Sequence, residues 1–138
     1  MTIKQLSVFL ENKTGRINDV ARILGEHGIN MYAFSMAETA DFGILRMIVS
    51  DVDAAKRVLR QAHFAVTPTG VVGITCPSAP RSLSPVLDIL ARGQVFIEYM
   101  YAFSEGELAS VIIRPTDVAK CIETLNRCKC RLVSFRSE

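Results

Sequence analysis

Residues 11–30 read ENKTGRINDVARILGEHGIN and set a short polar turn directly before a patterned helix. After Gly15 the apolar residues recur at i, i+3, i+4 and i+7, which is the spacing of one face of an α-helix. Gly28 then stops the helix, and a second apolar run begins at Ile29. The stretch therefore predicts a helix over residues 16–27 that connects two strands of a sheet.

The chain repeats this arrangement 66 residues later without a gap. The apolar positions of helix 16–27 fall on apolar positions of residues 83–91. Those of a second patterned helix, residues 51–62, fall on residues 117–128. Few residues are identical, but the apolar register holds along the whole length, which is typical of a duplicated unit.

Each copy is predicted to run in the order βαββαβ, in domains of residues 1–69 and 70–138 with only Pro68-Thr69-Gly70 as a break. The strands of the first copy are residues 3–10, 29–37, 44–49 and 65–69. Ser50 and Asp53 resemble a capping box at the start of the second helix. The strands of the second copy are residues 71–76, 95–103, 108–113 and 131–135. With right-handed crossovers, this order gives the ferredoxin-like fold of the α+β class, an antiparallel sheet with both helices on one face.

The third element of each copy is apolar on both of its faces. INMYAFSMA (residues 29–37) and VFIEYMYAF (residues 95–103) do not alternate cleanly, so their second face is expected to meet another layer. In the ferredoxin-like order this strand is also a sheet edge. We predict that the two copies pair through these edges into one eight-stranded sheet and that the chain forms a homodimer. The alternative is an extended strand pair in a monomer.

Composition narrows the class of protein. Of the 138 residues, 49% are hydrophobic and 22% are charged, and the net charge of +2 comes from interspersed residues of both signs. Nucleic acid is therefore not expected as a partner. No apolar run approaches the roughly 20 residues that cross a bilayer, so we expect no membrane association and a cytoplasmic location. The four cysteines are interpreted as core residues of a reducing compartment rather than as metal ligands.

Catalytic motifs are missing from the sequence. It has no glycine-rich phosphate loop, no G-x-S-x-G, no H-E-x-x-H and no C-x-x-C. His27 and His63 stand at helix ends, where a basic residue is favourable on electrostatic grounds. The aromatic residues of an RNA-binding sheet are present at Tyr99, Tyr101 and Phe103, but its basic motif is not. We therefore expect a non-enzyme without a metal or another cofactor.

The turn before the first helix is a candidate anion site. Gly15 permits close approach of the backbone, and the first N–H groups of a helix, here those of Arg16 and Ile17, lack internal partners. Together with the helix dipole they suit a carboxylate, with Asn12 and Thr14 as side-chain partners. The alternative is that Gly15 and Thr14 only cap the helix.

Asn12-Lys13-Thr14-Gly15-Arg16-Ile17, followed at helical distance by Gly28-Ile29-Asn30-Met31, resembles the signature of ACT domains. The βαββαβ order agrees with this resemblance, and the repeat extends it over the whole chain as two ACT-like units. The resemblance implies regulation by a small effector, most often a free amino acid, bound between the first turn of one domain and the edge strand of a neighbour. The ligand-binding residues that it implies are Asn12, Thr14, Gly15, Arg16, Ile17, Asn30, Met31, Tyr32, Glu98, Tyr99 and Met100.

This chain departs from the ACT pattern in two ways. Thr14 stands where the family has proline, which loosens the turn but adds a hydroxyl. The second copy has Pro77-Ser78-Ala79-Pro80-Arg81 in place of the signature and Gln94 in place of Gly28. We therefore expect one ligand per chain, held mainly by the first copy. Glu98 is expected either to face solvent or to accept a hydrogen bond from an ammonium group.

Two functions follow as hypotheses. The first is an amino-acid-binding regulatory protein that acts on a separate metabolic enzyme or regulator, such as an enzyme of amino-acid metabolism. The second is a constitutive assembly subunit that binds no ligand. The sequence leaves open both the amino acid and the regulated partner.

Overall fold

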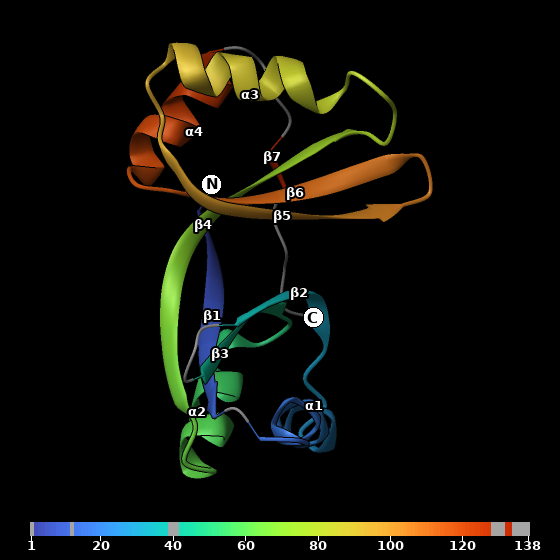
Figure 1. The fold of residues 1–138 in the computed structure, drawn as a ribbon, viewed down its shortest axis with the longest axis vertical. Helices are drawn as coiled ribbons and strands as arrows, with labels where there is room; N and C mark the ends of the chain where they lie inside the picture. Colours follow the sequence, from blue (N-terminus) through green and yellow to red (C-terminus); the bar gives the residue numbers. More distant parts are fainter. Residues whose placement is uncertain (1, 12, 39–41, 128–131, 134–138) are drawn as a thin grey trace. The chain divides into compact units, whose positions relative to one another are not determined.

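The computed structural model describes residues 2–11, 13–38, 42–127 and 132–133 (Figure 1). Seven strands and four helices follow one another along these residues. In chain order they are β1 Thr2–Glu11, α1 Arg16–Glu26, β2 Met31–Glu38, β3 Phe42–Val49, α2 Val52–Gln61, β4 Ala65–Pro77, α3 Leu83–Arg92, β5 Ile97–Glu105, β6 Leu108–Pro115, α4 Val118–Arg127 and β7 Leu132–Val133. The chain divides into two compact units. The N-unit contains Lys4–Thr69, and the C-unit begins at Gly70 and also takes in Thr2 and Ile3.

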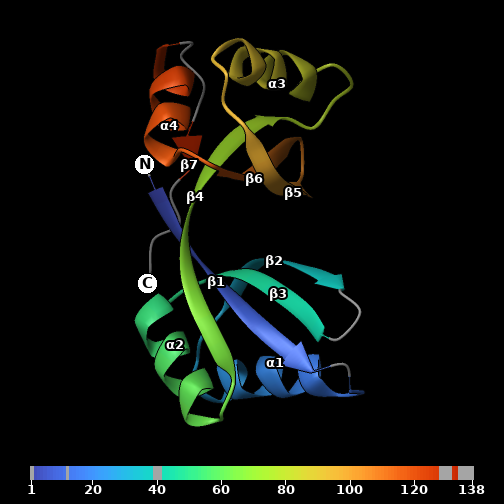
Figure 2. The same ribbon diagram turned by 60° about the vertical axis from the view of Figure 1, so that its left-hand side comes forward.

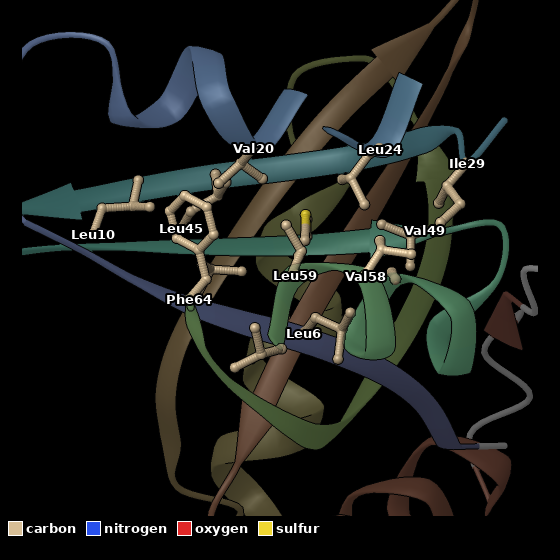
Figure 3. Packing of buried hydrophobic residues seen from close by; sticks show 14 residues of the cluster. Leu6, Leu10, Val20, Leu24, Ile29, Leu45, Val49, Val58, Leu59 and Phe64 are labelled. Carbon is tan, nitrogen blue, oxygen red and sulfur yellow. The ribbon is translucent and has the colours of Figure 1, made fainter. Parts of the chain in front are cut away.

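The N-unit is an antiparallel sheet with two helices on one face. Its strand order is β2-β3-β1-β4. Buried residues of β1 and β3 pack against those of α1 and α2, which lie on the same side of the sheet (Figure 2). The core between these layers includes Leu6, Val20, Leu24, Leu45 and Leu59 (Figure 3).

The C-unit repeats this architecture with the strand order β5-β6-β4-β7. Its core joins Val72 and Ile74 of β4 to Leu90 of α3 and Leu125 of α4. The prediction of the α+β class, with antiparallel strands in a ferredoxin-like arrangement, is therefore confirmed. The predicted edge position of the third element is also confirmed, because β2 and β5 are the terminal strands of the order.

The 66-residue repeat extends to details of the backbone. The register of β2 against β3 shifts between Met31 and Ala33, and that of β5 against β6 shifts between Ile97 and Tyr99. The bulged residue is thus Tyr32 in one copy and Glu98 in the other. Each bulge sits at the same position of its copy, so it belongs to the duplicated fold rather than to one domain.

Two local predictions are wrong. Residues 65–77 form the single strand β4, not two strands separated at Pro68-Thr69-Gly70. Pro68 lies within β4, a place that proline can occupy only where no ladder hydrogen bond needs its missing N–H. Gly70 marks a close approach instead of a turn, since a Cβ there would lie 3.0 Å from Cγ2 of Thr2. Pro68, Thr69 and Gly70, which were predicted to separate two strands, are therefore residues of one strand.

The predicted capping box is also displaced by one residue. The N-cap of α2 is Asp51, whose carboxylate accepts a hydrogen bond of 3.0 Å from the N–H of Ala54. Ser50 instead accepts a hydrogen bond of 2.9 Å from the N–H of Asn30. Its hydroxyl therefore ties the loop before β2 to the end of β3.

The predicted core position is confirmed for Cys76 and Cys121, which are free and buried in the C-unit. Cys128 and Cys130 lie outside the described residues. In the described part of the chain, none of the helices is long and apolar enough to span a membrane.

Candidate functional site

The β1–α1 turn is built around Gly15. The residue has φ 91° and ψ −4°, a left-handed conformation that a side chain disfavours. Among the described residues no side chain caps α1, so Thr14 does not serve as its cap. The first turn of the helix keeps the partial positive charge of its N–H groups, which suits an anion. Asn12, also predicted for this site, lies outside the described residues.

Two hollows, each of about 270 Å³, flank the side chain of Arg16. The turn hollow is lined by Leu10, Glu11, Lys13, Thr14, Arg16, Ile17, Met36 and Glu38. The aromatic hollow is lined by Phe9, Leu10, Glu11, Arg16, Phe42, His63, Phe64 and Ala65. The two hollows share Leu10, Glu11 and Arg16, so a charged wall stands between them.

Glu11 of this wall forms ion pairs with two basic residues. Lys13 Nζ lies 3.1 Å from Glu11 Oε2, and Arg16 Nη2 lies 3.7 Å from Glu11 Oε1. The hydrogen bond and charge of Lys13, followed by the charge of Arg16, hold the pKa of the Glu11 carboxyl below its ordinary value. Glu11 is therefore ionised at neutral pH. Because Lys13 and Glu11 are largely exposed, their ion pair adds little stability and is easily exchanged for another partner.

Arg16 has an unsatisfied donor. Its guanidinium lies 5.1 Å above the centre of the Phe64 ring, and Nη1 is 3.6 Å from Asp19 Oδ2. Its Nε is buried and has no hydrogen-bond partner in the part of the chain that the structure describes. A buried N–H without an acceptor is costly, and the 36% of the Arg16 side chain that is exposed leaves its charge open to a carboxylate.

The predicted residues of the first copy are distributed over both ends of the N-unit. Thr14, Arg16 and Ile17 line the turn hollow beside the cap Gly15. By contrast, Met31 pairs with Val49 at the far end of β2. The turn hollow meets β2 at Met36 and Glu38, five and seven residues along the strand from Met31, or about 16 and 23 Å. Asn30, Met31 and Tyr32 therefore do not line the turn hollow of their own unit.

Sequence reasoning missed Glu11, Lys13, Met36 and Glu38 in this hollow. The antiparallel register was the signal that could have found the two β2 residues. Leu10 and Glu38 both pair with Gly43, which brings the end of β2 beside the end of β1. A hairpin between β2 and β3 was predicted, but its pairing register was not.

The predicted residues of the C-unit lie on β5. Glu98 accepts a hydrogen bond of 3.0 Å from Arg114 Nε, and Arg114 Nη1 donates one of 2.7 Å to the carbonyl oxygen of Gly70. Neither sequence-based alternative named Arg114 as its partner. Met100 packs against the C-unit core, and Tyr99 is half-buried beside it.

The second copy serves as an internal comparison for the first. At the positions equivalent to Glu11, Lys13, Arg16 and Glu38 it has Pro77, Ala79, Ser82 and Ser104. There the Ser78 hydroxyl lies 3.2 Å from the Ser104 hydroxyl, and the Ser78 N–H donates 2.7 Å to the Glu107 carbonyl. The same fold therefore forms without the four charges, and they are a specific property of the first turn.

Comparison with known proteins gives a family model and a similar crystal structure that both match nearly the whole chain. A family model described as an ACT domain pair matches residues 1–135. Protein BT0572 from Bacteroides thetaiotaomicron has a crystal structure that covers 96% of this chain and 92% of its own, with 52% identity and a TM-score of 0.93. No curated protein matches this sequence.

Two more distant structures share the fold alone. The regulatory subunit of aspartate kinase from Thermus thermophilus, in its ligand-free form, is 14% identical, with 90% of each chain covered and a TM-score of 0.66. The corresponding subunit from Thermus flavus is 15% identical, with 91% of this chain and 92% of that chain covered and a TM-score of 0.62.

Proposed function

This chain is a member of the ACT domain pair family, and we propose that it is a regulatory protein whose effector is a free amino acid. In this proposal residues 1–69 and 70–138 are the two ACT-like domains, and the effector binds at the β1–α1 turn of the first. The observation that carries it is the set of four charges in the turn hollow, which the second copy lacks throughout. A zwitterion needs both signs of charge close together, and Arg16 and Glu11 supply them.

The proposed ligand-binding residues are those of the turn and of an edge strand from a neighbouring domain. The turn contributes Asn12, Thr14, Gly15, Arg16 and Ile17. The edge strands contribute Asn30, Met31 and Tyr32 of β2 and Glu98, Tyr99 and Met100 of β5. Since Asn30, Met31 and Tyr32 do not line the turn hollow of their own unit, they would complete a site only across an interface between domains.

The proposed assembly uses the same edges. Between Met31 and Ala37 the terminal strand β2 carries no charged residue, and Phe34 is 61% exposed. Edge strands that avoid pairing usually carry charges or proline, so this edge suits another strand. Pairing of β2 with β5 into an eight-stranded sheet, within a homodimer, is the arrangement that we propose.

Regulation would follow from linked equilibria. An effector shifts an assembly or a partner contact only if it binds two arrangements with different affinity. The proposed target is a separate enzyme or regulator, since the ACT fold of the aspartate kinase regulatory subunits supports a regulatory rather than a catalytic role. We propose a non-enzyme that acts in the cytoplasm, with an enzyme of amino-acid metabolism as its partner.

A second function has its own supporting observation. The exposed apolar side chains Phe34 and Met36 on β2 suit a constitutive assembly subunit even without a ligand. The two functions differ in whether any amino acid binds, and the edge strand alone does not distinguish them.

A thermal-shift screen of the full chain against the twenty amino acids at millimolar concentration tests the proposal. A ligand present at about one hundred times its Kd adds about 2.7 kcal/mol of apparent stability, which raises the Tm measurably. The site variant is Gly15→Val, and the matched control is Gly106→Val. Both glycines have positive φ (91° and 64°) and open space at Cβ, so both substitutions strain a turn to a similar degree.

The expected result is a selective rise in Tm that Gly15→Val abolishes and Gly106→Val retains. No shift with any amino acid would leave the assembly subunit as the better function. A shift that survives Gly15→Val would place the ligand away from the β1–α1 turn.

A further inference from the structure

We propose that the effector is an α-amino acid with an aromatic side chain, whose ring occupies the aromatic hollow while its charged head group meets Arg16 and Glu11. This inference rests on the proposed function and deepens it, because it names the class of ligand and a part of the site outside the β1–α1 turn. Three observations support it: the phenylalanine rings that line the hollow, the charges of Arg16 and Glu11, and the lack of these side chains at the equivalent positions of the second copy.

Three phenylalanines form the walls of the aromatic hollow. Phe9 of β1 and Phe42 of β3 are each 39% exposed, and their ring centres lie 5.8 Å apart in an edge-to-face arrangement. Phe64 also lines this hollow, and the Arg16 guanidinium lies over its ring. Aromatic rings pack favourably on one another at centre distances of about 4.5–7 Å, so a third ring has partners already in place.

The size of the hollow suits one amino acid. Its volume of about 270 Å³ is below the range of about 300–1,000 Å³ that drug-sized ligands fill. Five of its eight lining residues are apolar, against three of eight in the turn hollow. An apolar ring therefore gains more contact in the aromatic hollow than beside the charged residues of the turn hollow.

Arg16 and Glu11 provide the two charges for the head group. Both are shared by the two hollows, so they border the space beside the three rings. The ion pairs of Arg16 with Glu11 and Asp19 measure 3.7 and 3.6 Å, longer than hydrogen bonds, and its buried Nε has no acceptor among the described residues. The Arg16 side chain is 36% exposed, so a ligand carboxylate can reach its terminal Nη groups and replace these long ion pairs.

The Glu11 carboxylate can bind the ammonium group of the same ligand. Its ionised carboxylate is 61% exposed and is held by Lys13, whose side chain is 72% exposed. A ligand ammonium can take the place of Lys13 at small cost, because exposed ion pairs contribute little. The carboxylate and ammonium of an α-amino acid thus each have a partner in the wall between the hollows.

The second copy lacks the same rings. In the 66-residue register Phe9, Phe42 and Phe64 correspond to Thr75, Leu108 and Cys130, and Glu11 and Arg16 correspond to Pro77 and Ser82. The second copy has the same strand order without these five side chains. Neither the rings nor the charges are required by the fold, and all five side chains occur together in the first copy.

The test uses the absence of tryptophan from this chain. Fluorescence of added L-tryptophan can be followed without background from the protein, and calorimetry extends the titration to L-phenylalanine, L-tyrosine, L-leucine and L-methionine. We expect the aromatic amino acids to bind at least about tenfold more tightly than leucine, from ring burial and ring packing together. Phenylethylamine and 3-phenylpropionate, which each lack one charged group, should bind more weakly than phenylalanine.

Replacing residues of the aromatic hollow by their counterparts in the second copy tests whether the ligand ring binds there. Phe42→Leu and Phe9→Thr should each weaken L-phenylalanine binding by about three- to tenfold. The matched control, Phe96→Leu, removes a ring that is 70% exposed in the C-unit and should leave the affinity unchanged. Arg16→Ser should weaken binding by about tenfold or more, whereas Arg22→Gln on the same helix should not.

The outcomes separate the two proposals. If leucine or another non-aromatic amino acid binds best, and Gly15→Val abolishes that binding, the proposed function stands and the aromatic class is overturned. If phenylalanine binds but neither Phe42→Leu nor Phe9→Thr affects it, the aromatic hollow is not its site. If no amino acid binds, the proposed function fails and the inference fails with it.

Discussion

Arg81 adopts the same left-handed backbone as Gly15, which stands 66 residues earlier: φ is 67° at Arg81 and 91° at Gly15. Gln94 and Gly28 form a second such pair, with φ of 58° and 68°. The second copy thus keeps both turns of the ACT signature without either glycine. Non-glycine residues pay about 1–2 kcal/mol for this conformation, so the fold imposes it from outside the local sequence.

Replacing Arg81 or Gln94 by glycine should therefore stabilise the chain. We expect each of Arg81→Gly and Gln94→Gly to raise the free energy of unfolding by about 0.5–1 kcal/mol, because removing the Cβ relieves more strain than the added backbone entropy costs. Chemical denaturation measures the change. Ala91→Gly, within α3, is the control and should lower stability by about 1 kcal/mol. A loss of stability in both test variants would contradict the strain account.

The helix caps should be worth the same in both copies. Asp51 accepts from the N–H of Ala54 and Asp117 accepts from that of Lys120, each at 3.0 Å. Asp51→Ala and Asp117→Ala should each cost about 1 kcal/mol of unfolding free energy, because an N–H of the first helical turn loses its acceptor. Asp53→Ala, the position of the mistaken capping box, should cost less than either. An equal loss of unfolding free energy in Asp53→Ala would instead support the predicted capping box of Ser50 and Asp53.

Lys13 and Arg16 should both lower the pKa of Glu11, and Lys13 should lower it more. Lys13 lowers that pKa most and Arg16 lowers it less, so Lys13→Ala should raise it more than Arg16→Ser does. The charge pairs favour folding above the unfolded-state pKa of Glu11, and this contribution disappears as the pH falls through the lower folded-state pKa. Carboxyl NMR titration of the full chain measures the midpoint. A midpoint that neither variant moves would show that these charges do not act on Glu11.

Cys121 should be unreactive in the folded chain. It is fully buried, and burial raises the pKa of its thiol from 9.0 to about 11. Stability from this group is complete below pH 9.0 and is lost as the pH rises toward 11, since only the unfolded thiol ionises freely. Iodoacetamide at pH 8 followed by peptide mass spectrometry should label Cys121 slowly until denaturant is added. Fast labelling of the native chain would contradict its burial.

The interaction of Glu98 with Arg114 should contribute less than the hydrogen bond from Arg114 to Gly70. Glu98 is 47% exposed, so a double-mutant cycle of Glu98→Gln and Arg114→Met should give a coupling below about 1 kcal/mol. Arg114→Met alone should cost more than Glu98→Gln alone, because it also removes the donor to the Gly70 carbonyl. Equal losses in the two single variants would overturn this ranking.

Much of the fold could be predicted because the repeat supplies two examples of each element. The helix from Arg16 was predicted from its apolar spacing and the glycine before it, and its observed start agrees. Asp51 as the cap, and the continuity of β4 through Pro68, could not be read from residue preferences. A cap depends on where the helix axis meets the preceding strand, and a proline is harmless only on a strand side that pairs with nothing.

The lining of the turn hollow was predicted only in part, at residues close to one another in the sequence. Thr14, Arg16 and Ile17 were identified because a helix start with an exposed glycine has a known electrostatic character. Glu38 and Phe42 were missed because they reach the turn through strand pairing, from positions 22 and 26 residues after Arg16. A pattern of apolar residues predicts that a strand pairs, but it does not give the register.

By itself the sequence determined the element order, the duplication and the helix faces, because these follow from periodicities of a few residues along the chain. Only the tertiary structure decided which side chains share a space: Phe9, Phe42 and Phe64 around one hollow, with Arg16 and Glu11 as the wall between it and the next. These residues come from three strands or their ends and from one helix, and their meeting depends on strand register. The local pattern fixes the fold, and the pairing of distant strands fixes which residues line the two hollows.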